Sequence, residues 1–156
     1  MHPPKLMFST LTDHFDRHLY ATASVLDSEI SSIKSAIDRH ENEVADHKIL
    51  ELEARAGDKL QNHHRYNLNV QRARLLMAKG EWVQAGQIFL DAMRFQRTTD
   101  RARINEALGY ELLGQRMKAH EMVSALRKEI THSELLLAMW IRTAPDTTPL
   151  ADLRQP

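Results

Sequence analysis

A fixed spacing in the second half of the chain constrains its fold most strongly. Gly80 and Gly114 lie 34 residues apart, and each divides a pair of amphipathic segments. At the same offset, small residues match small ones and large residues match large ones. The matched pairs are Ala73 with Ala107, Leu76 with Tyr110, Ala85 with Ala119, Phe89 with Val123, and Ala92 with Leu126. A repeat of this period predicts a stack of antiparallel helix pairs.

At these residues the chain resembles the tetratricopeptide repeat (TPR) family, in two units at residues 66–99 and 100–133. In the first unit, the run from Gly80 to Ala85, followed by Phe89 and Ala92, is similar to the family's turn and second helix. The second unit departs from the pattern, with Val123 and Leu126 where an aromatic residue and an alanine are typical. The residues that it keeps are Ala107, Tyr110, Gly114 and Ala119.

A third unit is not found with this offset, which reaches Asp46 backward from Gly80 and Thr148 forward from Gly114. The repeated alanines allow the helices to approach closely, and the two glycines suit the left-handed conformation at the end of a helix. Two units cannot bury both of their end faces, so the flanking segments are expected to cap the stack.

The first third of the chain is predicted to be helical, because no Gly or Pro interrupts it between Pro4 and Gly57. Apolar residues recur every three or four positions from Leu26 onward, which is heptad spacing. Two arrangements fit: a helical hairpin that turns within residues 38–43, which we favour, or a long helix in a two-stranded coiled coil. In either case an apolar stripe needs a cover, so we expect a homodimer. The residues assigned to this self-association are Leu26, Ile30, Ile33, Ile37 and Val44.

The C-terminal third contains a capping box, Thr131-His-Ser-Glu134, which predicts an apolar helix that ends before Pro145 and packs on the last repeat. We therefore divide the chain into four parts. These are a flexible start at 1–8, a helical or coiled-coil segment at 9–64, TPR-like repeats with a capping helix at 65–143, and a loose tail at 144–156.

The composition excludes several classes of protein. The chain has no cysteine, so disulfide scaffolds and thiol chemistry are ruled out. Its longest apolar run, residues 135–141, is far shorter than a membrane span, and no secretory signal is recognised, so we expect a cytoplasmic protein. The net charge is zero, but residues 1–60 carry 11 acidic and 7 basic side chains, and residues 61–156 carry 10 and 14. The two halves, or two subunits, are therefore expected to meet with opposite signs.

Catalytic and metal-binding motifs are not recognised. Nine histidines are present, including the pair His14 and His18, the pair His40 and His47, and the adjacent His63 and His64. None forms an HExxH motif, and we interpret them as surface, capping or coiled-coil residues that hold no metal. Gly-rich phosphate loops and nucleophile motifs are missing too, so we predict no enzyme and no cofactor.

In the TPR family, the first helix of each unit lines a concave groove that binds a peptide or a helix. By this resemblance and by helical phase, the groove residues are predicted to be Gln71, Arg74, Met77, Arg101, Asn105 and Leu108. The two arginines would pair with carboxylates, Asn105 would hold a peptide backbone, and Met77 with Leu108 would take an apolar side chain.

The sequence thus predicts an all-α protein with an N-terminal long helix or hairpin, TPR-like antiparallel helix pairs and a C-terminal capping helix. The predicted function is non-catalytic protein binding, as an adaptor, assembly factor or small chaperone. Two alternatives stay open: a secretion-type chaperone with a TPR fold, and a nucleic-acid-associated regulator that uses the basic stretch Arg65–Arg103.

Overall fold

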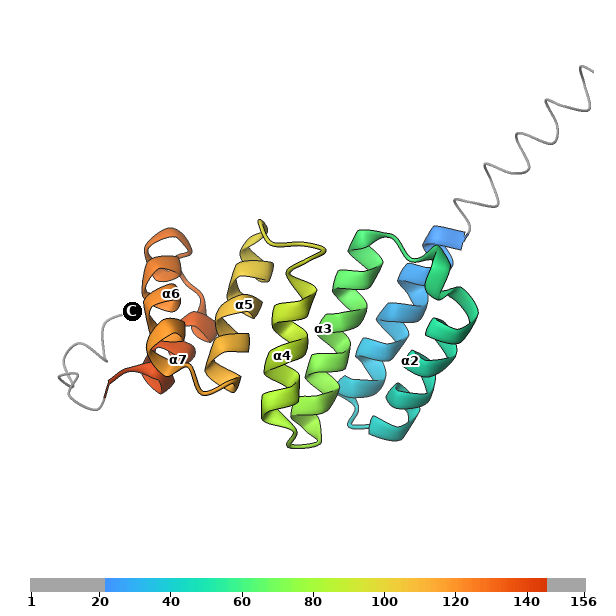
Figure 1. Ribbon diagram of the computed structural model, residues 1–156, viewed down its shortest axis with the longest axis horizontal. Coiled ribbons are helices and arrows are strands. Elements are labelled where there is room, and N and C mark those ends of the chain that lie inside the picture. Colours follow the sequence, from blue (N-terminus) through green and yellow to red (C-terminus); the bar gives the residue numbers. More distant parts are fainter. Residues whose placement is uncertain (1–21, 146–156) are drawn as a thin grey trace, which may run out of the picture.

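The protein is a linear stack of helices. A computed structural model describes residues 22–145, in which every regular element is a helix. Three antiparallel hairpins and a last helix lie side by side in chain order (Figure 1). The all-α fold class is confirmed. Of the described helices, none has the length and apolarity needed to cross a membrane.

The first hairpin contains a helix at residues 22–38, called the 22–38 helix below. The remaining elements are α2 (Asn42–Ala56), a short 3₁₀ helix (Gly57–Lys59), α3 (Asn62–Ala78), α4 (Trp82–Ala92), α5 (Asp100–Leu112), α6 (Arg116–Glu129) and α7 (Glu134–Thr143). The domain boundary that we expected at residue 64 falls in the first turn of α3. The predicted flexible start at 1–8 lies outside the described residues, as do His14, His18 and most of the predicted tail.

All three hairpins turn in the same way. One residue in each turn has a left-handed backbone: His40 (φ 61°), Gly80 (φ 78°) and Gly114 (φ 81°). The N–H of the following residue bonds back to the preceding helix; in the first hairpin, Glu41 N donates to Ala36 O over 2.9 Å. This is the hydrogen-bond pattern of a Schellman motif. The glycine turns that the sequence predicted are confirmed at Gly80 and Gly114.

The first hairpin therefore has the same turn as the two predicted repeats, although the 34-residue offset missed it. Five positions after its left-handed residue, each hairpin places a fully buried alanine: Ala45, Ala85 or Ala119. The spacing from His40 to Gly80 is 40 residues because α2 and α3 have 15 and 17 residues, against 11 and 13 in α4 and α5.

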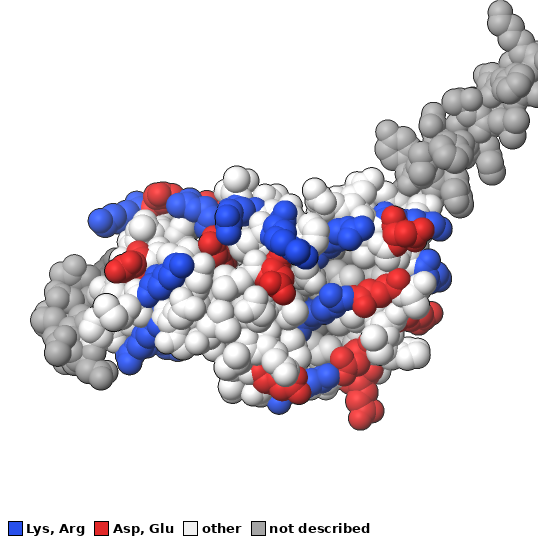
Figure 2. All heavy atoms as spheres, in the orientation of Figure 1, with Lys and Arg blue, Asp and Glu red and all other residues white. Residues whose placement is uncertain are grey.

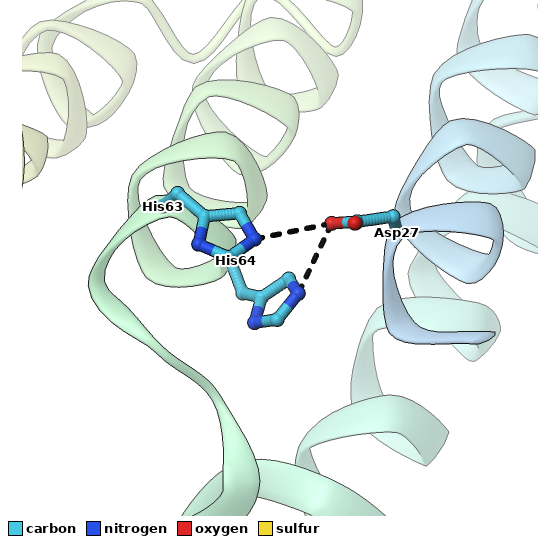
Figure 3. Close-up of side chains that lie close together, drawn as sticks. All are labelled: Asp27, His63 and His64. Carbon is cyan, nitrogen blue, oxygen red and sulfur yellow. Dashed lines mark ion pairs between the residues drawn. The ribbon is translucent and has the colours of Figure 1, made fainter. Parts of the chain in front are cut away.

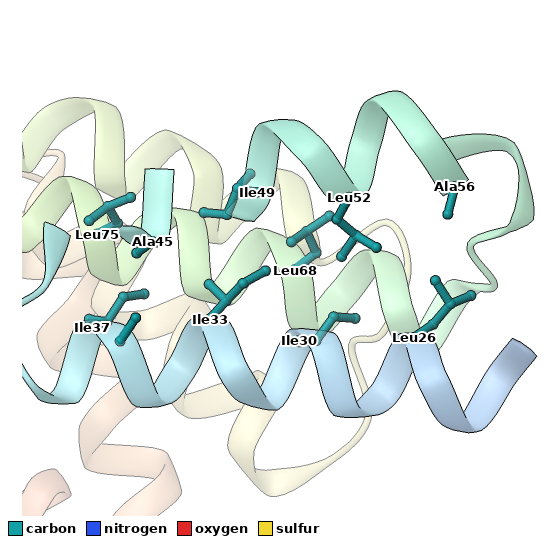
Figure 4. Close-up of a cluster of buried hydrophobic side chains, with 11 residues drawn as sticks. Leu26, Ile30, Ile33, Ile37, Ala45, Ile49, Leu52, Ala56, Leu68 and Leu75 are labelled. Atoms are coloured by element: carbon teal, nitrogen blue, oxygen red, sulfur yellow. The ribbon is translucent and has the colours of Figure 1, made fainter. Parts of the chain in front are cut away.

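The apolar stripe of the 22–38 helix is covered within the chain. Leu26, Ile30, Ile33 and Ile37 are each at most 6% exposed and pack against α2 and α3 (Figure 4). The hairpin alternative is thus confirmed, and the expectation that this stripe needs a second copy as its cover is wrong. Val44, on α2, is 43% exposed. Homodimer formation stays a prediction, but four of its five assigned residues lie in the core of one chain.

The acidic and basic halves of the chain contact each other within a single copy of the protein. Two basic residues of α3 and its C-cap residue Lys79 each form an ion pair with an acidic residue of the first hairpin. The pairs are Arg74 with Asp38, Arg72 with Glu53, and Lys79 with Asp46. The charge split in the sequence therefore corresponds to an interface between the first hairpin and α3.

The predicted apolar helix near the C-terminus is α7. Its N-cap is Ser133, whose Oγ accepts a hydrogen bond from Leu136 N over 3.2 Å, so the helix begins two residues later than a box opening at Thr131 implies. Leu136 and Met139 are fully buried against α5 and α6, which confirms that α7 packs on the helix pair before it.

Candidate partner-binding groove

A groove of about 650 Å³ runs between the 22–38 helix, α3 and α5. Its apolar floor includes Ile30 from the first of these helices, Val70 from α3 and the buried Phe89 from α4. Four of the six predicted groove residues line it: Gln71, Arg74, Arg101 and Asn105. Met77 and Leu108 do not, and Leu108 packs instead against the core formed by α5, α6 and α7. The predicted apolar subsite at these two residues is therefore not part of this groove.

A buried hydrogen bond joins α3 to α5 at the groove. Asn105 Nδ2 donates to the hydroxyl oxygen of Tyr66 over 2.9 Å, and both residues are less than 9% exposed. Burial raises the pKa of Tyr66, while the hydrogen bond from Asn105 and the charge of Arg101 act in the opposite direction. The hydroxyl keeps its proton at neutral pH and offers it as a donor.

The groove is lined by three cationic side chains, and two of them, Lys34 and Arg74, pair with a carboxylate of the chain itself. Arg74 lies 2.5 Å from Asp38 Oδ1 and also donates to Gln71 Oε1 over 2.7 Å. Lys34 pairs with the same Asp38 at 3.0 Å. The carboxylate that we expected Arg74 to bind on a partner is therefore supplied by the chain's own first hairpin.

Arg101 is exposed on the groove wall and forms no ion pair or hydrogen bond with any residue of the described part of the chain. Its guanidinium group presents five N–H donors in a planar fork that fits a carboxylate. The same groove is lined by Tyr66, whose hydroxyl feels the charge of Arg101, and by the amide side chains of Asn67 and Asn105. This part of the groove offers hydrogen-bond donors and the positive charge of Arg101, which forms no ion pair with a carboxylate of residues 22–145.

Near one end of the groove, three side chains that could bind a metal converge (Figure 3). Asp27, from the 22–38 helix, lines the groove, and its Oδ1 lies 3.4 Å from His63 Nε2 and 3.0 Å from His64 Nε2. His64 is completely buried, and its Nδ1 accepts a hydrogen bond from Gln61 N over 3.1 Å as part of a capping box.

The other predicted histidine pair is separated. His40 occupies the first turn, not a coiled-coil seam, and His47 is exposed on α2, where its Nε2 lies 3.8 Å from Glu51.

Sequence reasoning placed Arg101 and Asn105 by helical phase but missed Tyr66, Asn67 and Asp27. Tyr66 lies in the second turn of α3. The 34-residue offset gives no counterpart for it, because the matching position in the next unit is Asp100. Asp27 is 36 residues away from His63, on another helix, so no local spacing signals their proximity.

The chain was compared with protein families, curated proteins and solved structures. No family model, curated protein or solved structure matches it.

Proposed function

We propose that this chain is a non-catalytic protein-binding module, an adaptor, assembly factor or small chaperone, that holds a segment of a partner polypeptide in the groove. The observation that carries this proposal is the exposed guanidinium group of Arg101, which has no carboxylate partner among the described residues. A carboxylate on a partner would accept charge-assisted hydrogen bonds from this guanidinium group.

The other groups in the groove suit a peptide. Amide side chains of Asn67, Gln71 and Asn105 can both donate to and accept from a peptide backbone. Val70, which is half-buried on the groove floor, offers apolar surface between these polar groups. We therefore propose that the bound segment is extended and carries at least one Asp, one Glu or a terminal carboxylate.

This function is tested by selecting random peptides from a display library on the full chain, and then challenging the selected peptides with Arg101→Glu. We expect the selected peptides to share an acidic position and to lose binding to Arg101→Glu. Arg94→Glu is the matched control, since Arg94 is an exposed arginine in the turn after α4 and does not line the groove. Peptides that bind Arg101→Glu as well as they bind the wild type would refute the groove assignment.

Arg101 is a better probe than the other groove residues. Arg74→Glu would place a carboxylate beside Asp38, and Asn105→Ala would remove the buried bond to Tyr66. Both changes disturb the fold as well as the groove, whereas the Arg101 side chain forms no ion pair or hydrogen bond with residues 22–145.

A nucleic-acid-associated regulator is the second candidate. Lys and Arg side chains line the upper edge of the molecule in Figure 2, and the guanidinium groups of Arg65 and Arg94 lie 6.0 and 5.6 Å from the Phe95 ring. Cations beside an aromatic ring suit a stacked base. Five of the eight basic residues in the stretch 65–103 have carboxylate partners, however, which weakens this candidate. These five are Arg72, Arg74, Lys79, Arg97 and Arg103.

The two candidates differ in how binding depends on salt. A regulator should bind single or double strands with an affinity that falls steeply with salt concentration, and less steeply in an Arg65→Ala, Arg94→Ala double variant. A protein-binding module should show no such binding. A secretion-type chaperone would use the same groove, and the identity of the captured partner would distinguish it.

A further inference from the structure

We propose that Asp27, His63 and His64 form a binding site for a divalent cation of the zinc class. Asp27 also lines the groove, but the metal proposal does not depend on the partner proposed there. It joins two helices that are distant in sequence: Asp27 belongs to the 22–38 helix, and the two histidines open α3 (Figure 3). Two imidazole nitrogens and one carboxylate oxygen are a ligand set that Zn²⁺ accepts, with a water molecule as the fourth ligand.

The distances within the cluster fit a metal site. In a tetrahedral zinc centre with bonds of 2.0–2.1 Å, neighbouring ligand atoms lie about 3.3 Å apart. Asp27 Oδ1 is 3.4 Å from His63 Nε2 and 3.0 Å from His64 Nε2, and all three ligand atoms lie within 4.8 Å of one another. The cluster could therefore take up the ion with small movements of the side chains.

A second observation concerns the buried histidine. His64 is 0% exposed, and its Nε2 makes no hydrogen bond although Asp27 Oδ1 is only 3.0 Å away. The carboxylate oxygen therefore lies off the axis along which Nε2 donates. Two ligands of one metal ion have this relation, because each points at the ion and not at the other. A buried polar atom without a hydrogen bond is also costly, and a metal ion would satisfy it.

Metal binding would break one hydrogen bond of the structure, and this loss can be measured. In the structure His64 Nδ1 accepts from Gln61 N, so the proton of the neutral ring is on Nε2. An ion bound at Nε2 requires this proton to move to Nδ1, and the hydrogen bond from Gln61 is then lost. Zinc should therefore release the Gln61 amide, even as it ties the 22–38 helix to α3.

The experiment is a calorimetric titration of the full chain, without an affinity tag, with zinc chloride. We expect one ion per chain, and at least a tenfold weaker affinity in Asp27→Asn and in His63→Gln. Both residues are more than half exposed, so these variants should fold. The matched control is His47→Gln, which removes an exposed histidine from a similar pair with Glu51 and should bind zinc like the wild type.

A second measurement follows the apo and zinc-loaded chain by NMR. We expect the proton of His64 to move from Nε2 to Nδ1 and the Gln61 amide to exchange faster with solvent. The proposal is overturned if no saturable binding occurs, if Asp27→Asn and His63→Gln bind zinc as the wild type does, or if the His64 tautomer stays unchanged in the loaded chain. Unchanged zinc binding in Asp27→Asn and His63→Gln would assign the ion to other histidines of the chain.

Discussion

Asp38 is one of the residues that join the first hairpin to α3. Its Oδ1 lies 2.5 Å from the Arg74 guanidinium group, and its Oδ2 lies 3.0 Å from Lys34 Nζ. Hydrogen bonds from Arg74 first, and then from Lys34, hold the pKa of Asp38 below its ordinary value. The stability that the lowered pKa provides is complete above the unfolded pKa of about 3.9 and is lost as the pH falls through the folded pKa.

We expect Arg74→Gln to raise the pKa of Asp38 towards its ordinary value, because the largest cause of its lowering is removed. Carboxyl NMR shifts recorded during an acid titration measure this pKa directly. Arg97→Gln is the control, since Arg97 pairs with Glu106 in another hairpin and should leave Asp38 unchanged. An equal pKa in wild type and Arg74→Gln would contradict the ion pair.

His40 is the only non-glycine residue among the three left-handed turn positions. A side chain in this conformation costs about 1–2 kcal/mol. We expect His40→Gly to raise the free energy of unfolding by about 1 kcal/mol and Gly80→Ala to lower it by a similar amount. A methyl group at Gly80 would meet no atom within 4 Å, so its effect would come from the backbone alone. Chemical denaturation measures both, and a destabilised His40→Gly variant would contradict the shared turn.

At the scale of elements, α4 and α5 approach each other at two glycines. A Cβ atom on Gly86 would lie 2.8 Å from the carbonyl oxygen of Gly109, and one on Gly109 would lie 3.0 Å from Leu90. Contacts below 3.0 Å with backbone atoms cannot be relieved by a side-chain movement. The close crossing of α4 and α5 therefore requires glycine, which has no Cβ atom, at positions 86 and 109.

We expect Gly86→Ala to lower the free energy of unfolding by about 1–3 kcal/mol, although alanine is the better helix former. Gly57→Ala is the matched control, because Gly57 has a helical backbone and open space around it, and we expect it to be neutral or stabilising by up to about 1 kcal/mol. Thermal or denaturant unfolding distinguishes the two. If both variants gained stability, α4 and α5 would not cross at Gly86.

The elements also show how far the sequence could be read. Gly80 and Gly114 indicated two turns, since glycine is the usual residue there. The polar run at 38–43 favoured a turn in the first hairpin, but His40 gave no signal that this turn has the same left-handed geometry as the other two. The buried alanine at position 45 could be aligned only once the turn was known. In the groove, helical phase found Arg101 and Asn105 on α5. Tyr66 is brought to Asn105 because α3 and α5 both pack on α4, and no pattern within one helix reveals this.

For the whole molecule, the zero net charge results from cancellation between an acidic first hairpin and the basic remainder, which meet through the ion pairs of α3. The apolar stripe of the first hairpin is likewise buried within one chain. Stability of this region should therefore not depend on a second copy.

We expect Ile33→Ala to lower the free energy of unfolding by about 2–4 kcal/mol, because Ile33 is 1% exposed in the core of the first hairpin. The loss should be the same at high and low protein concentration. Denaturant unfolding at two concentrations a hundredfold apart tests this. A loss that grows on dilution would show that Ile33 packs between two copies.

The groove proposal depends on direct recognition of a partner carboxylate by Arg101. A double-mutant cycle tests it most directly, using Arg101→Ala in the protein and alanine at the acidic position of a selected peptide, with dissociation constants measured by calorimetry. The account predicts a coupling energy of about 1–3 kcal/mol between the two changes. Purely additive effects, with no coupling energy, would contradict it.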